Sequence, residues 1–193
     1  MYAFTLQTFQ PEAHGTGQQL EPRWQKGRQF VLRHPSARQI PALLDKGSLT
    51  ARLVSASGGD FKVKVLYQGW QRPRRSEARL LGMPERQMAI AREVALCCFD
   101  EPWVYARSIL PVTTVTGRLR HLRKFDDSAL GAMLFKDRSM HRTDYELADF
   151  RGLSTLLPSQ LQHKQAGFGR RSCFFLDDKP LMVSEIFLDG FKA

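Results

Sequence analysis

The sequence has no long apolar run and few cysteines. None of its 193 residues belongs to a stretch approaching the roughly 18–20 apolar residues that cross a bilayer, so we expect no membrane span. Residues 1–10 lack a basic segment followed by an apolar core, which argues against a secretory signal. The three cysteines are odd in number, and Cys97 and Cys98 are adjacent. This usage is typical of reduced thiols, and we expect a cytoplasmic protein.

The common phosphate, nucleotide and metal motifs are also missing. Gly15-Thr16-Gly17 lacks the third glycine of a dinucleotide fingerprint, because Leu20 stands in its place. No Walker-type loop and no G-x-S-x-G elbow of a serine hydrolase occur. The five histidines are isolated, without H-E-x-x-H or C-x-x-C spacing. We therefore expect no metal and no cofactor.

Acidic residues are scarce beside the basic ones. The chain has 19 Asp and Glu against 29 Lys and Arg, which gives a formal charge of +10. Such an excess indicates either a nucleic-acid partner or a field that attracts a small anionic substrate. The basic clusters at 72–79 and 118–124 belong to no helix-turn-helix or zinc-finger pattern and lack interleaved aromatics. We expect a solvated basic surface and no nucleic-acid partner.

The length and composition are those of one globular domain with a full core, since 42% of the residues are hydrophobic and 25% are charged. Residues 1–38 show no clear periodicity and are expected to form an N-terminal extension to a core at 40–188. Apolar, β-branched residues flank a polar break at 99–102, which predicts a β-hairpin within 87–111. A second hairpin is expected from strands 168–176 and 180–188, with its turn at 177–179.

Strands at 61–70 and 138–150 bring the expected number to six. Short helices are predicted at 41–44, 129–135 and 49–54, the last capped by Ser48. Residues 71–86 are rich in Arg, Pro and Gly and are expected to form a surface loop or flap. Because strands and helices do not alternate, the pattern predicts an antiparallel sheet of the α+β class.

Two charged residues each stand alone on an apolar strand face. Side chains in a strand alternate between faces, so Arg92 shares its face with Met88, Ile90, Val94 and Leu96. In the same way, Glu185 shares a face with Leu181, Val183 and Phe187. A buried guanidinium cannot lose its charge and needs an anionic partner. Either the two residues form a structural salt bridge, or they line a dry pocket for a small molecule with an anionic end.

A series of six short motifs occurs in order between residues 40 and 188. They are GSLTAR at 47–52, REV at 92–94, EPWVYAR at 101–107, LGAMLF at 130–135, RRS at 170–172 and SEIF at 184–187. Each motif alone is weak, but their order and spacing together are specific. The series resembles that of the chorismate pyruvate-lyase family. Ala129, Ser184 and Asp189 depart from it, where the family commonly has Pro, Thr and Pro.

The resemblance implies a monomeric, cofactor-free cytoplasmic enzyme on a six-stranded antiparallel sheet, with short helices and flaps covering a buried ligand pocket. Such an enzyme converts chorismate into 4-hydroxybenzoate and pyruvate, which opens ubiquinone biosynthesis. The resemblance places the ring carboxylate at Arg92 and the hydroxyl end of the ring at Glu185. Backbone amides at Leu49 and Leu130 would complete the pocket. Whether Glu185 donates a proton or only orients the ring stays open at this stage.

A binding protein is the main competing hypothesis. The same sheet architecture serves as the effector-sensing domain of some bacterial transcription regulators, and a fold does not determine a function. Those regulators carry an N-terminal winged helix-turn-helix. The residues before position 40 are too irregular to predict one, so the lyase function is favoured over an aromatic-acid sensor.

Overall fold

The computed structural model describes residues 21–34, 40–123 and 130–192. Its strands are β1 (Gln25–Lys26), β2 (Phe61–Gln71), β3 (Ala89–Cys98), β4 (Glu101–Pro111), β5 (His141–Arg142), β6 (Glu146–Asp149), β7 (Ala166–Leu176) and β8 (Lys179–Leu188). Its α-helices are α1 (Gly27–Arg33), α2 (Ile40–Leu44), α3 (Leu49–Ala56), α4 (Arg75–Leu80) and α5 (Leu130–Leu134). Turns of 3-10 helix lie at Gly117–Arg123, Ser154–Leu156 and Ser159–Leu161. No helix in the described ranges is long and apolar enough to cross a membrane.

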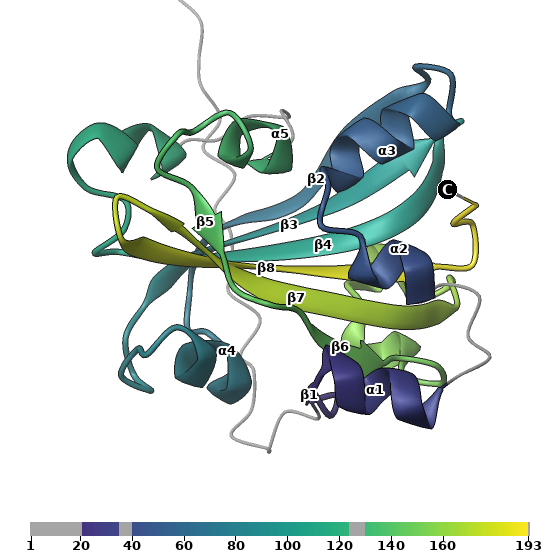
Figure 1. The fold of residues 1–193 in the computed structure, drawn as a ribbon, viewed down its shortest axis with the longest axis horizontal. Coiled ribbons are helices and arrows are strands. Elements are labelled where there is room, and N and C mark those ends of the chain that lie inside the picture. The colour runs from purple at the N-terminus through teal and green to yellow at the C-terminus, as the bar shows by residue number, and fades with distance from the viewer. Residues whose placement is uncertain (1–20, 35–39, 124–129, 193) are drawn as a thin grey trace, which may run out of the picture.

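All strands belong to one antiparallel sheet (Figure 1). The order is β1-β6-β7-β8-β4-β3-β2, and β5 pairs with β7 beside this path. The two long hairpins, β3–β4 and β7–β8, meet through pairing of β4 with β8. This junction puts four long strands side by side at the centre of the sheet, and it brings residues 90–110 next to residues 166–188.

The predicted hairpins are present, with tight turns of two residues. Phe99 and Asp100 have φ of 54° and 58°, and Asp177 and Asp178 have φ of 47° and 59°. Two consecutive positive φ angles give the turn whose twist matches that of paired strands, and Asp tolerates this conformation better than most residues. The second turn therefore does not include Lys179, which is the first residue of β8.

The expectation of six strands is wrong, because the residues that the structure describes already form a sheet of eight strands. The single strand expected at 138–150 is two short strands, β5 and β6, which pair with β7 at separate places. Between them Thr143 exchanges hydrogen bonds with Cys173, but partly through its hydroxyl group, so the regular ladder is interrupted. The remaining strand is β1, which pairs with β6.

Residues 21–34 were expected to belong to an irregular extension, and this is wrong for them. They form β1 and α1, and Phe30 of α1 is fully buried. Its ring packs edge-on against Phe168 at 5.3 Å between centroids, and Trp24 packs in the same way against Phe150. The aromatic side chains supply the burial that the local periodicity did not show. The rest of the expected extension, residues 1–20 and 35–38, lies outside the described residues.

Residues 71–86 contain a helix, α4, where only a loop or flap was expected. Glu77 defines its first turn, because its side chain accepts a hydrogen bond from the Arg74 backbone amide at 2.8 Å. The same side chain is buried against the sheet. The cap predicted for α3 is confirmed, since the Ser48 hydroxyl accepts a hydrogen bond from the Ala51 amide at 3.3 Å.

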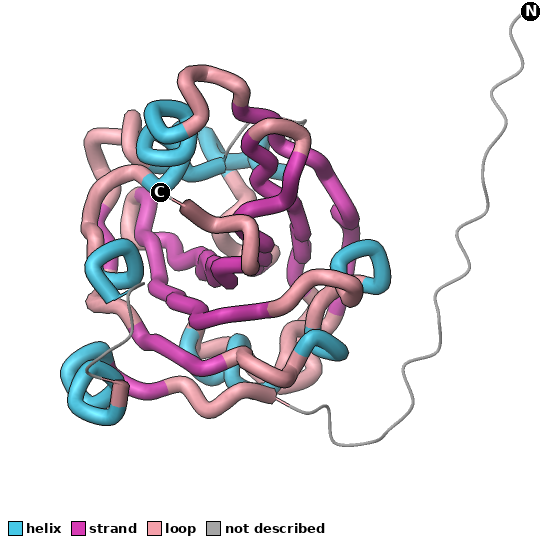
Figure 2. Tube along the Cα trace, turned by 90° about the vertical axis from the view of Figure 1, so that its right-hand side faces the viewer, coloured by secondary structure: helices cyan, strands magenta, loops and turns pink. Residues whose placement is uncertain are grey.

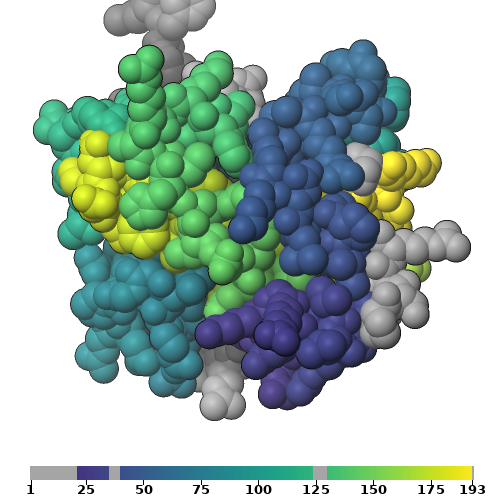
Figure 3. Space-filling model, in the orientation of Figure 1, coloured from purple at the N-terminus to yellow at the C-terminus, as the bar shows by residue number. Residues whose placement is uncertain are grey.

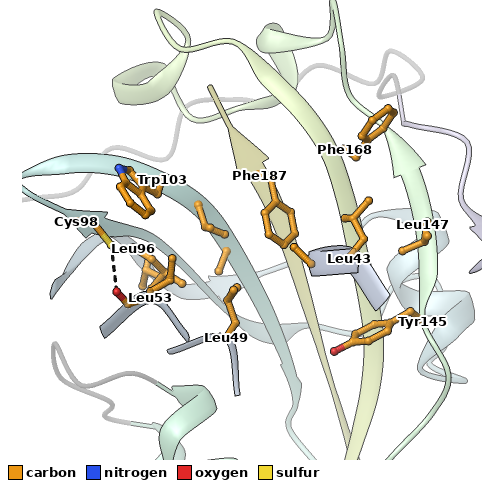
Figure 4. Packing of buried hydrophobic residues seen from close by; sticks show 14 of the residues in the cluster. Leu43, Leu49, Leu53, Leu96, Cys98, Trp103, Tyr145, Leu147, Phe168 and Phe187 are labelled. Carbon is orange, nitrogen blue, oxygen red and sulfur yellow. Dashed lines mark hydrogen bonds between the residues drawn. The ribbon is translucent and has the colours of Figure 1, made fainter. Parts of the chain in front are cut away.

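The helices divide between the two faces of the sheet. In Figure 1, α2, α3 and α5 lie on one face and α4 lies on the other. Helix α1 lies beside β1 and β6 at the edge of the sheet, and its Phe30 packs into the same core as α2 and α3. Figure 2 shows the helices around the outside of the curved layer of strands. Beneath α2 and α3 the core is packed by aliphatic and aromatic side chains, including Leu43, Leu53 and Phe187 (Figure 4). The face with α3 and α5 is the one that holds the cavity.

Candidate active site

A cavity of about 550 Å³, partly open to solvent, lies between the sheet and the helices α3 and α5. The wall is lined by Gly47, Leu49, Thr50, Val63, Arg92, Val94, Leu96, Ala106, Ser108, Leu130, Gly131, Leu134, Phe135, Arg142, Arg170, Phe174, Val183 and Glu185. Most of these side chains are apolar. In Figure 3 the surface of residues 40–56, in blue, adjoins that of the segment after residue 130, in green.

All four residues expected at the site line this one cavity: Leu49, Arg92, Leu130 and Glu185. Arg92 on β3 and Glu185 on β8 are separated by β4, where they face Ser108 and Ala106 respectively. Two strand spacings and an offset of two residues put their Cα atoms ~12 Å apart. The two side chains can therefore reach opposite ends of a single six-membered ring.

Arg92 is 3% exposed and lies on the floor of the cavity. Its Nε donates to the Gln68 Oε1 atom at 3.0 Å, and Gln68 is its neighbour across the β2–β3 ladder. This bond holds the plane of the guanidinium against the sheet. A fixed, planar guanidinium is suited to bidentate recognition of a carboxylate.

Glu185 has an ion-pair partner on the neighbouring strand. The Arg170 Nε donates to its Oε2 atom at 2.5 Å, and the two residues face each other across the β7–β8 ladder. Arg170 is further fixed by carbonyl oxygens, because its Nη1 donates to Ala42 at 2.9 Å and to Asp45 at 2.8 Å. Burial alone would lower the pKa of Arg170, but the charge and hydrogen bond of Glu185, together with Tyr145 and Asp45, raise it. Glu185 is thus held in place by a group that the sequence interpretation had not assigned to it.

Leu49 and Leu130 are the first residues of α3 and α5, and both are buried. The backbone amide of the first residue of a helix has no acceptor within its own helix. Two such amides therefore belong to residues on the cavity wall, opposite the sheet. This placement agrees with the amide role that the family resemblance implied, although it does not test that role.

Arg142 also lines the cavity and was not singled out from the sequence. It is half-buried on β5, opposite Phe174 of β7. Its guanidinium lies 4.6 Å from the centre of the Tyr145 ring, and its Nη2 donates to the Lys46 carbonyl oxygen at 2.8 Å. The two-residue length of β5 left no alternating pattern from which its direction could be predicted.

The opposite face of the sheet carries a second group of buried charges. Arg107 donates to both carboxylate oxygens of Glu77, at 2.8 and 3.1 Å, and also pairs with Glu93. Arg171 on the same face pairs with Glu146. Burial alone would raise the pKa of Glu77, but the charge and hydrogen bonds of Arg107 hold it below the usual value of 4.5. These groups satisfy one another, which is typical of a structural network rather than of a ligand site.

Metal-ligating side chains do not gather in the described part of the chain, where no group of three or more His, Cys, Asp or Glu is placed to hold an ion. The thiols of Cys97, Cys98 and Cys173 are buried, and burial raises the pKa of each. A thiol with a raised pKa is a poor nucleophile at neutral pH. The reactive possibilities of the cavity thus rest on its arginines, Glu185 and backbone amides.

Comparison with known families shows to which family the chain belongs. The family described as chorismate lyase matches residues 20–191. The chain belongs to the chorismate lyase family. The activity of this family, conversion of chorismate to 4-hydroxybenzoate and pyruvate, is the activity of this chain, and the family's role in ubiquinone biosynthesis fits it. The match begins well before residue 40, which agrees with the packing of β1 and α1 into the fold.

Similar proteins agree with this membership. A protein of Methylococcus capsulatus named "Probable chorismate pyruvate-lyase" is 36% identical over 148 residues, covering 76% of this chain and 91% of its own. One of the same name from Halorhodospira halophila is 33% identical over 178 residues, covering 90% and 94%. Among solved structures, PhnF from Mycobacterium smegmatis is similar with a TM-score of 0.52 and 14% identity, covering 89% of this chain and 90% of that one. At that identity the likeness shows the fold alone.

Proposed function

We propose that chorismate loses its enolpyruvyl group inside the cavity between the sheet and helices α3 and α5. The observation that carries this proposal is the placement of Arg92 and Glu185 on one face of the sheet, two strands apart, in an otherwise largely apolar cavity. The ring carboxylate of chorismate would pair with the Arg92 guanidinium. The hydroxyl-bearing carbon at the far side of the ring would lie at Glu185, and the amides of Leu49 and Leu130 would bind polar atoms of the substrate from above.

The chemistry asks little of the protein beyond this placement. The bond between the ring and the ether oxygen breaks, and the hydrogen of the neighbouring hydroxyl-bearing carbon passes to the methylene carbon of the enolpyruvyl group. That group leaves as pyruvate, and the ring becomes aromatic. Aromatisation supplies the driving force. The protein contributes by fixing the reactive conformer, excluding water and stabilising the charge that develops on the ether oxygen.

Glu185 is proposed to orient the ring rather than to supply a proton. Its Oε2 atom already accepts a hydrogen bond from Arg170. A carboxylate held in this way is a good acceptor for the hydroxyl group of the substrate and, after the reaction, for the phenol of the product. The ion pair also compensates the cost of keeping the charge in a largely apolar cavity.

Replacing Glu185 by Gln keeps the shape of the side chain and removes its charge. We expect kcat to fall roughly tenfold to a hundredfold, because the acceptor that orients the reacting carbon is weakened and Arg170 loses its counter-charge. Steady-state assays of 4-hydroxybenzoate formation by absorbance measure this. Glu146→Gln, which alters a Glu–Arg pair on the other face, is the matched control. An unchanged kcat in Glu185→Gln would contradict the assignment.

Helices α3 and α5 are proposed to act as flaps that open for substrate and product. Four residues of these helices line the cavity, namely Leu49, Thr50, Leu130 and Leu134, so movement of either helix would widen its opening. Product release is then expected to limit turnover. Rapid-mixing experiments should show a burst of 4-hydroxybenzoate equal to the enzyme concentration. A strictly linear first turnover would exclude slow release.

We also propose that the protein works as a cofactor-free monomer in the cytoplasm and has no nucleic-acid partner. The charge of +10 is then a field that draws in the dianionic substrate. In that case kcat/KM should fall with ionic strength, and a filter-binding titration with DNA at two salt concentrations should show no appreciable affinity. A chain that binds an aromatic acid without converting chorismate would instead be a sensor.

A further inference from the structure

Chorismate differs from its aromatic product by a second carboxylate. The product keeps only the carboxylate on the ring, whereas the substrate carries another on the enolpyruvyl group. That group is attached beside the hydroxyl-bearing carbon, so it projects sideways from the line that joins the ring carboxylate to the hydroxyl. If the ring lies between Arg92 and Glu185, the enolpyruvyl carboxylate must meet a different part of the cavity wall.

Among the described residues, three guanidinium groups line the cavity: Arg92, Arg142 and Arg170. In the proposed placement Arg92 binds the ring carboxylate. Arg170 is committed to Glu185 and to the carbonyl oxygens of Ala42 and Asp45. Arg142 is therefore the group whose charge has no other assignment in the site.

The surroundings of Arg142 suit an incoming carboxylate. Among the residues that the structure describes, no carboxylate lies within ion-pair distance of it, and only one of its hydrogen bonds is made, to the Lys46 carbonyl oxygen. A guanidinium has five N–H donors, so most remain for a ligand. The rings of Tyr145 and Phe174, at 4.6 and 5.5 Å, hold the group in position and limit its hydration.

The position of Arg142 agrees with a sideways substituent. On the β8 strand Glu185 faces Arg170 of β7, whereas Arg142 of β5 faces Phe174, further along the same β7 strand. Because Phe174 lies four residues along β7 from Arg170, Arg142 is displaced along the strand direction from the line between Arg92 and Glu185. If the ring is held at Arg92 and Glu185, the enolpyruvyl group on the carbon next to the hydroxyl-bearing carbon points away from the line between these two residues.

We propose that Arg142 binds the enolpyruvyl carboxylate of chorismate and so makes the site specific for a ring with two carboxylates. The inference rests on the proposed placement of the ring between Arg92 and Glu185. Arg142 holds the departing group in the conformation from which the ether bond breaks. It makes no contact with 4-hydroxybenzoate, which lacks that carboxylate.

The test compares substrate and product binding in Arg142→Met, which keeps the length of the side chain and removes its charge. We expect KM for chorismate to rise roughly tenfold to a hundredfold, as for loss of one partly buried charge pair. The dissociation constant of 4-hydroxybenzoate, measured by calorimetry, should stay within about threefold of the wild-type value. Arg142→Lys should recover part of the loss, and Arg138→Met, at an exposed arginine four residues away, should change neither quantity.

A second measurement removes the charge of Arg142 and the charge of the enolpyruvyl carboxylate separately and together. The wild type should use chorismate much better than its side-chain monomethyl ester, and Arg142→Met should use the two nearly equally. An unchanged KM in Arg142→Met, or an equal loss of affinity for 4-hydroxybenzoate, would overturn the proposal. Arg92→Ala separates it from the placement on which it rests: if that variant still binds 4-hydroxybenzoate normally, the ring placement itself is wrong.

Discussion

Arg92→Ala should lower kcat/KM for chorismate about a thousandfold, since truncating one partner of a buried, hydrogen-bonded charge pair removes several kcal/mol of binding. Arg92 is 3% exposed, so water cannot replace the lost guanidinium for a carboxylate enclosed in the cavity. The same variant should lose affinity for 4-hydroxybenzoate, which retains the ring carboxylate. Steady-state kinetics and calorimetry measure the two effects.

Two companion variants make this result interpretable. Arg92→Lys keeps the charge but not the planar fork, so it should recover only part of the activity. Arg138→Ala removes an exposed arginine outside the cavity and should leave kcat/KM unchanged. A thermal melt of each variant shows whether the fold is intact. Wild-type kcat/KM in a folded Arg92→Ala protein would refute the proposed site.

Glu77→Gln should reduce the free energy of unfolding by about 3 kcal/mol, because it leaves Arg107 buried with less compensating charge. Arg107 uses both oxygens of the Glu77 carboxylate, and the two side chains are 4% and 5% exposed. Urea denaturation measures the loss. Glu85→Gln breaks an exposed pair with Arg75 and should cost less than about 1 kcal/mol.

The contribution of Glu77 should also depend on pH in a defined direction. Its pKa in the folded protein is below the usual 4.5, so folding is favoured by the charged form. The stabilisation is fully present above pH 4.5 and is lost as the pH falls through the lower, folded value. The difference between wild type and Glu77→Gln should therefore shrink in acid. A difference that grows below pH 4 would show that the carboxyl is neutral in the folded state.

Strand alternation and turn chemistry predicted two of the four candidate site residues, whereas Leu49 and Leu130 came only from the family resemblance. The two hairpins gave long strands, and alternation then put Arg92 and Glu185 each on an apolar face. The partner of Glu185 depends on the length of the second turn, which was predicted one residue too long. With Lys179 counted in the turn, Arg170 would face Ile186; the turn of Asp177 and Asp178 shifts the register by one and places Arg170 opposite Glu185. Whether Lys179 belongs to the turn or to β8 thus determines whether Arg170 faces Glu185.

Other features could not be predicted because they depend on long-range contacts. Helix α4 forms in an Arg- and Pro-rich stretch because Glu77 is buried against Arg107, 30 residues away in the chain. Strand β1 has only two residues and exists because β6 provides an edge for it. Arg142 lies on a strand equally short. Local patterns carry no signal for elements of this kind, since tertiary packing alone stabilises them.

The outermost strand β2 has a consequence for how these molecules behave when crowded together. It ends the sheet order within the described residues, and an open edge can recruit a strand from another copy and start fibrous aggregation. Lys62 and Lys64 are exposed along β2, and the pairing register slips between Val65 and Tyr67. Repulsion between such lysines and a local distortion both discourage edge-to-edge growth. Substituting valine for Lys62 and Lys64 would remove that protection, and neither residue lines the cavity.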